Sequence, residues 1–178
     1  IVERNKKITA KELREKASHD SVMEAYIDNW WNCVRQEYEN DETNKYNAYA
    51  KTLILNWSNK IMFAHLIKRR QNGARKIDTI SYTTTPEETS AIFEEITKKS
   101  DFFNVFSEVK YGNFIPDAAW RDCVELSCFL RDNGISELDQ TALQNVLERT
   151  VNTLKRELNG QYTTPLTLAR ILVRLSLQ

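Results

Sequence analysis

The sequence contains few of the residues that interrupt regular structure. Its 178 residues include only four glycines and three prolines. Strands joined by tight turns need more of both, and the alternation typical of strands is weak and confined to residues 76–84. We therefore expect an all-α domain of about six to eight helices.

The sequence also lacks an excess of charge, a long apolar run and an even set of cysteines. Lys and Arg number 25 and so do Asp and Glu, so net charge does not predict a polyanionic partner. No run approaches 18 apolar residues, so we expect no membrane span. The first residues lack the apolar core of a secretion signal and are typical of a position inside a longer protein. Cys33, Cys123 and Cys128 fit neither a disulfide framework nor a zinc site, which indicates the reducing cytoplasm.

Two capping boxes predict where the first helices begin. They pair Thr9 with Glu12 and Ser21 with Glu24. The residues before Thr9 carry no helix signal. We expect them to be disordered or to complete an upstream element.

A long helix is predicted from about residue 44 to residue 71. Gly73 follows as a plausible stop. Large apolar side chains recur in this stretch at steps of three or four and predict one continuous packing face. They are Tyr46, Tyr49, Leu53, Trp57, Ile61 and Ala64.

Four further helices follow in the sequence. Thr85 and Pro86 predict the start of a helix that runs to about Lys99. Asp101 is expected to cap a short one. Two more are predicted at 117–132 and 139–158, each ended by an Asn-Gly pair.

Familiar catalytic and metal-binding patterns are weak in this chain. His19 and His65 belong to no metal-ligand spacing, so we predict no metal site and no catalytic residue. Glu108 and Lys110 have the Glu-x-Lys spacing of restriction nucleases, but the strand that should carry them is poorly supported. Asp122 and Glu125, three apart on a predicted helix, are interpreted as ordinary surface acids.

One stretch, residues 68–76, is strongly basic and contains no acid. Its cations would complement the negative end of the preceding helix, which is a purely structural explanation. Contact with DNA phosphates is the functional alternative. The candidates for this weak DNA binding are Lys68, Arg69, Arg70, Arg75 and Lys76.

The segment GQYTTPLTLARILVRL, residues 160–175, carries a family resemblance. It resembles the start of the catalytic domain in N6-adenine DNA methyltransferases of restriction–modification and phage-defence systems. Thr163 departs from that pattern, which often has a second aromatic residue there. The matching positions are Gly160, Gln161, Tyr162, Thr164 and Pro165. Residues 53–77 also resemble the helical region that precedes the methylase in single-chain enzymes of this kind.

The resemblance implies two parts. Residues 1–158 would form an α-helical connector domain, and residues 159–178 would begin an S-adenosylmethionine-dependent methyltransferase domain with its first helix. The rest of that α/β domain would lie beyond Gln178. In the family this segment lies near the methionyl part of the cofactor, so Tyr162, Thr164 and Pro165 are the candidate cofactor-binding residues.

The resemblance also implies limits and partners. The family's Asn-Pro-Pro-aromatic motif needs adjacent prolines, and no two prolines of this chain are neighbours. We therefore expect a non-catalytic piece of a site-specific adenine DNA methyltransferase. Its partners would be DNA, through the parent protein, and the remaining methyltransferase domain. The alternative is a helical protein–protein interaction module with no nucleic-acid role.

Overall fold

The computed structural model describes residues 1–38, 42–99 and 102–134, and this part of the chain is helical with no strand. The all-α prediction is confirmed. These residues belong to the first of two units into which the chain divides, Ile1–Ser136. The helix predicted at 139–158, the boundary at 158 and the segment 159–178 lie outside the described residues.

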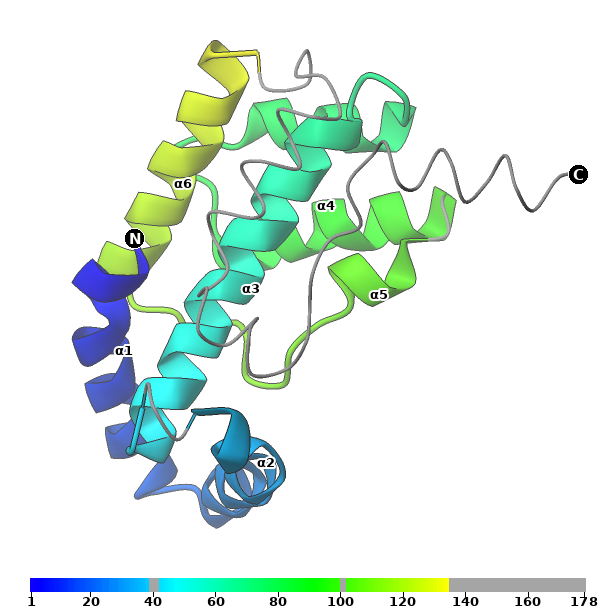
Figure 1. Cartoon of the computed structure of the whole chain (residues 1–178). Coiled ribbons are helices and arrows are strands. Elements are labelled where there is room, and N and C mark those ends of the chain that lie inside the picture. The colour runs from blue at the N-terminus through cyan, green and yellow to red at the C-terminus, as the bar shows by residue number, and fades with distance from the viewer. Residues whose placement is uncertain (39–41, 100–101, 135–178) are drawn as a thin grey trace, which may run out of the picture. The chain divides into compact units, whose positions relative to one another are not determined.

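The longest helix, α3, is the centre of the unit (Figure 1). It contacts α1, α2, α6 and the 3-10 helix η1. In chain order the elements are α1 (Val2–Ala17), α2 (Ser21–Tyr38), α3 (Lys45–Ile67), η1 (Asn72–Thr79), α4 (Pro86–Lys99), α5 (Phe103–Phe106) and α6 (Asp117–Asp132).

The α3 helix begins and packs as its sequence predicts. The Asn44 side chain accepts hydrogen bonds from the amides of Tyr46 and Asn47, which satisfies two free donors of the first turn. All six residues of the predicted face are buried. The helix ends at Ile67, four residues before the predicted end, because Gln71 is extended (φ −121°) and starts η1.

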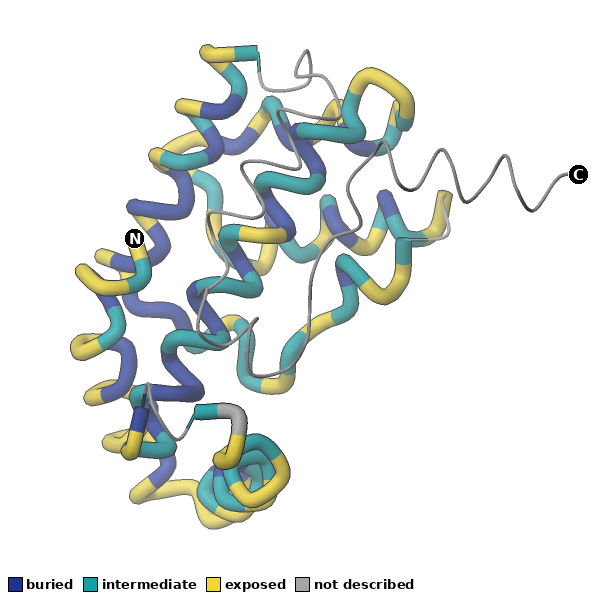
Figure 2. Tube along the Cα trace, viewed as in Figure 1, coloured by how far each residue is buried: buried dark blue, intermediate teal, exposed yellow. Residues whose placement is uncertain are grey.

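Two hydrophobic clusters lie along α3. The first joins α1 and α2 to its N-terminal half, with Tyr49 and Leu53 at the centre. The second joins η1, α4, α5 and α6 to its C-terminal half around Trp57 and Ile61. Figure 2 shows this as buried positions along α3 and on the faces turned toward it. A single helix therefore supplies packing surface to both clusters.

The predicted start of the first helix is wrong. The α1 helix begins at Val2, and Thr9 lies within it, where its hydroxyl donates to the Asn5 carbonyl at 2.9 Å. Its first turn is held by Asp122 of α6, which accepts hydrogen bonds from Arg4 and from Asn5 (2.6 Å). Asp122 is 6% exposed, so interpreting it as a surface acid is also wrong.

Of the two other expected caps that the structure describes, only Thr85 caps its helix as expected. Thr85 and Glu88 exchange side chain–amide hydrogen bonds at the start of α4, a complete capping box. At the start of α2 the cap is Asp20, which accepts from the amides of residues 22 and 23, and Glu24 instead binds Lys45 of α3. Asp101, expected to cap the next helix, lies outside the described residues.

Within the part of the chain described, no helix is both long and apolar enough to cross a membrane. Of the cysteines, Cys33 is exposed, Cys128 is half-buried and Cys123 is buried, and all three are free thiols. Burial raises the pKa of Cys123 to about 12, so this thiol stays protonated.

Candidate functional site

The two lysines of the basic stretch are held in ion pairs within the fold. Lys68 donates to Asp78 of η1 at 2.7 Å, just beyond the end of α3. Lys76 of η1 and Lys99 of α4 both donate to Glu95. These two hydrogen bonds lower the pKa of the Glu95 carboxyl to about 2. Both lysines therefore have a carboxylate partner within the fold, a structural role different from the predicted complement to the helix end.

The three arginines of the stretch differ from the lysines. Arg69 and Arg70 lie in the turn after α3, Arg75 lies in η1, and all three are exposed. The guanidinium groups of Arg70 and Arg75 can therefore be reached by a large anion such as DNA. Of the five predicted DNA-binding residues, Lys68 is half-buried and paired with Asp78. Lys76 is exposed although it pairs with Glu95, and the three arginines are exposed.

His65 lies in an arrangement that looks catalytic but is closed to substrate. Its Nε2 is 2.9 Å from the Ser127 hydroxyl of α6, and its Nδ1 is 3.6 Å from an Asp78 oxygen. This has the order of an acyl-transfer triad. However, His65 is 0% exposed and Ser127 2%, so no substrate carbonyl can reach the hydroxyl. Burial, followed by the nearby charge of Lys68, lowers the pKa of His65 to about 4, and the neutral ring serves as a buried link between α3 and α6.

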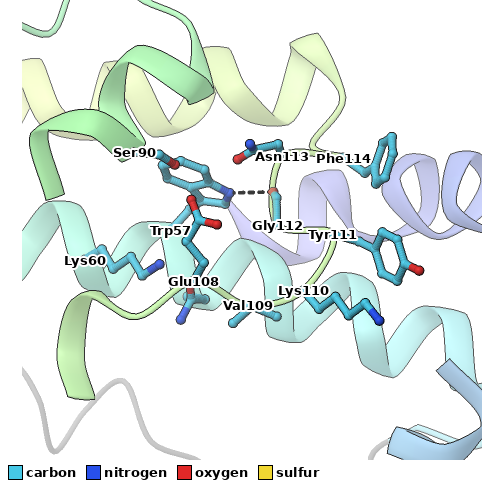
Figure 3. Close-up of a pocket in the computed structure, with 11 residues that line it drawn as sticks. Trp57, Lys60, Ser90, Glu108, Val109, Lys110, Tyr111, Gly112, Asn113 and Phe114 are labelled. Atoms are coloured by element: carbon cyan, nitrogen blue, oxygen red, sulfur yellow. Dashed lines mark hydrogen bonds between the residues drawn. The ribbon is translucent and has the colours of Figure 1, made fainter. Parts of the chain in front are cut away.

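A pocket of about 390 Å³ lies between α3, α4 and the loop before α6 (Figure 3). Its walls are Asn56, Trp57 and Lys60 of α3, Ser90 of α4, and loop residues 108–114. We call it the Lys60 pocket. Its size and its mixture of aromatic and polar walls are typical of a small-molecule site.

The loop wall is fixed by a tight turn. The amide of Gly112 donates to the carbonyl of Val109 at 2.8 Å, and Tyr111 between them has a φ of 60°. That left-handed conformation is unfavourable for a tyrosine. It is held by the ring, which packs edge-on against Tyr26 at 5.6 Å between centroids. The Gly112 carbonyl accepts the Trp57 indole N–H at 2.9 Å, which ties the turn to α3.

Lys60 is the unusual residue of this pocket. It is 5% exposed and lies among the apolar residues of α3. Among the described residues its ammonium has the rings of Trp57 and Phe93 as neighbours, 5.9 and 5.8 Å from their centroids, and no hydrogen-bond acceptor. Burial lowers the pKa of Lys60 to about 8, and the charge of Glu108 only partly opposes this. A lysine so placed is a candidate binding group.

The sequence signal for Lys60 was available but was not used. Lys60 lies three residues after Trp57 and four before Ala64, so it occupies the apolar face of the predicted long helix. A charged residue on such a face indicates either a buried ion pair or a functional group. No ion pair with Lys60 is found among the described residues.

The remaining predicted sites divide between described and undescribed parts of the chain. Glu108 and Lys110 lie on the pocket loop, with no strand to carry the nuclease pattern. Lys110 instead places its ammonium 4.7 Å from the Tyr26 ring centroid. The candidate cofactor-binding residues Tyr162, Thr164 and Pro165 lie outside the described residues. Among residues that are described, no group of three or more His, Cys, Asp or Glu side chains could hold a metal.

The chain matches no family model, and it has no significant similarity to a curated protein or to a solved structure.

Proposed function

We propose that this chain is the helical connector region, with the first segment of the catalytic domain, of an adenine-specific DNA methyltransferase. The parent enzyme would belong to a restriction–modification or phage-defence system. The resemblance of residues 160–175 carries this assignment. The role of the helical unit would be to position the methylase on DNA while taking no part in the chemistry.

The exposed arginines support a weak DNA contact by the unit itself. Arg70 and Arg75 lie on either side of Gly73, the first in the turn after α3 and the second in η1. Guanidinium groups bind phosphate oxygens with two parallel hydrogen bonds, better than an ammonium does. Because the net charge of the chain is zero, the contact would be local and sequence-independent, and it would weaken as salt rises.

The test is the salt dependence of duplex DNA binding by the 178-residue chain. Affinity is measured by fluorescence anisotropy between 50 and 200 mM salt for the wild type and for Arg70→Gln/Arg75→Gln. Each lost phosphate contact lowers the slope of log K against log salt by about 0.9, so the double variant should lose about 2. The control Lys7→Gln/Lys11→Gln removes two exposed cations from α1 and should keep the slope. Equal slopes for all three proteins would contradict the proposed contact.

The cofactor and the compartment follow from the same proposal. S-adenosylmethionine would be the methyl donor of the parent enzyme. Tyr162, Thr164 and Pro165 would hold its methionyl part at the start of the catalytic domain. An enzyme that modifies cellular DNA would act in the cytoplasm, where free cysteines stay reduced.

The alternative function is a helical protein–protein interaction module. Among the described residues four large hydrophobic side chains are more than 60% exposed: Tyr82 of a turn, and Val22, Phe103 and Phe129. The last three come from three different helices, and single exposed apolar residues are common on protein surfaces. The DNA-binding assay separates the two functions, because the alternative predicts no binding even at 50 mM salt.

A further inference from the structure

The Lys60 pocket presents a cation that the fold does not neutralise. A buried ammonium normally has an ion-pair or hydrogen-bond partner, because its desolvation is costly. Lys60 is 5% exposed, and the described residues offer its ammonium two aromatic rings at almost 6 Å and no acceptor. The nitrogen itself is not sealed from solvent, because no fully buried side-chain nitrogen among these residues lacks a partner. In Figure 3 it extends from α3 toward the end of the pocket where Trp57 and Glu108 lie.

The other charged groups around the pocket leave this position open to an anion. Glu108 is exposed and attracts Lys60 only over a distance, since no ion pair within 4 Å joins them among the described contacts. Lys110 lies toward the opposite end of the pocket, with its ammonium near the rings of Tyr26 and Tyr111. An anion that enters beside Lys60 therefore meets its positive charge, while the exposed Glu108 carboxylate of the same pocket opposes the anion.

The remaining walls suit the organic part of such a ligand. Trp57 supplies an aromatic surface whose N–H is already bonded to Gly112, so the ring is fixed before anything binds. Asn56, Ser90 and Asn113 add amide and hydroxyl groups around the opening. A volume of about 390 Å³ accommodates a single aromatic ring with its charged substituent.

We propose that the Lys60 pocket binds a small organic anion, an aryl carboxylate or aryl phosphate, with the Lys60 ammonium as counter-ion and Trp57 as the aromatic wall. This site lies apart from the arginines of the proposed DNA contact and does not depend on that function. Binding takes up protons, because an anion beside Lys60 favours its charged form. The Lys60 pKa, which burial has lowered to about 8, therefore rises when the pocket is occupied.

The test uses benzoate and phenyl phosphate as probes, with benzyl alcohol as the neutral analogue, added to the 178-residue chain. Two NMR signals report binding: the Trp57 indole N–H and the ε-methylene of Lys60. We expect at least one anion to shift the indole signal saturably and to raise the titration midpoint of Lys60, while benzyl alcohol does neither. The anion that binds more tightly identifies the class, carboxylate or phosphate.

Variants of Lys60 distinguish specific binding in the pocket from non-specific binding of anions to the surface. Lys60→Met and Lys60→Gln should each weaken binding at least tenfold, as expected for the loss of a charged partner. Lys7→Met, at an exposed position of α1, should leave the affinity unchanged. The concentration of each anion reaches about 10 mM, which suits a small ligand that binds weakly. If neither anion gives saturable shifts at that concentration, the proposal is overturned. Binding that survives both Lys60 substitutions would also overturn it.

Discussion

Replacing Lys60 with methionine should stabilise the protein at neutral pH. At pH 7 the lysine is charged in both the folded and the unfolded chain, and the folded state pays for its desolvation. The fall of the Lys60 pKa from 10.5 to about 8 corresponds to ~3 kcal/mol of lost stability. Methionine fills a similar volume without the charge but loses the weak attraction to the Trp57 and Phe93 rings, worth about 1 kcal/mol. The expected net gain is about 2 kcal/mol.

The gain should depend on pH in a defined direction. A lysine whose folded pKa is depressed costs stability below both pKa values, and the cost disappears as the pH rises from 8 to 10.5. The charge penalty should therefore fall from about 3 kcal/mol at pH 7 to about 1 kcal/mol at pH 10. Urea denaturation followed by circular dichroism, at both pH values, measures the difference between wild type and Lys60→Met.

A control substitution at an exposed lysine tests whether the effect is specific to Lys60, and either of two results would contradict the lowered pKa of Lys60. Lys7→Met replaces an exposed lysine of α1 and should change stability by less than about 0.5 kcal/mol at either pH. Destabilisation of the chain by Lys60→Met at pH 7 would contradict the desolvation cost assigned to Lys60. An equal gain at pH 7 and pH 10 would contradict it as well, because the lysine would then not be titrating with a lowered pKa.

Two further substitutions test the turn and the α1–α6 contact. Gly112→Ala should cost about 1–3 kcal/mol and shift the Trp57 indole signal, because a Cβ there would lie 2.8 Å from the Val109 carbonyl oxygen. Gly73→Ala, whose Cβ would meet only a flexible lysine side chain at 3.4 Å, should be close to neutral in the same melts. Asp122→Ala should lower the free energy of unfolding by about 2 kcal/mol, since it removes the hydrogen bonds that join Arg4 and the buried Asn5 of α1 to α6. Glu125→Ala, an exposed acid beside the same arginine, should change it by less than about 0.5 kcal/mol, and equal losses would contradict the assignment of the buried contact.

Local patterns predicted the parts of this fold that local physics decides. The apolar steps of three and four from Tyr46 to Ala64 describe a face that is buried along its whole length. The helix start predicted at Thr85 and Pro86 also forms, and the structure adds a capping box between Thr85 and Glu88, which lie within one helical turn.

The failures involve residues whose role depends on distant partners. Thr9 resembles a cap, but the helix continues toward the N-terminus because Arg4 and Asn5 find Asp122 more than a hundred residues away. The three-residue spacing of Asp122 and Glu125 suggested two surface acids, and only packing against α1 makes the first one buried. Lys60 was missed because an apolar pattern tolerates one charged residue, and its buried position depends on α4 and the loop at 108–114.

The basic stretch shows the same difference between what a local pattern predicts and what distant partners decide. Composition singles out the basic stretch at 68–76 as a candidate for phosphate contact. Which of its cations are paired within the fold depends on Asp78 and Glu95, which come from η1 and α4 and bind the two lysines. The sequence pattern alone does not distinguish Lys68 from Arg70.

The proposal that the parent protein methylates adenine in DNA can be tested on that protein itself. The most direct test expresses the full-length parent gene in a host without adenine methylases and measures N6-methyladenine in its DNA by mass spectrometry. If the proposal holds, the DNA of that host contains N6-methyladenine. The parent gene then also encodes a glycine-rich loop and an Asn-Pro-Pro-aromatic motif downstream of Gln178. Unmethylated DNA from a parent that lacks this motif would contradict the proposal.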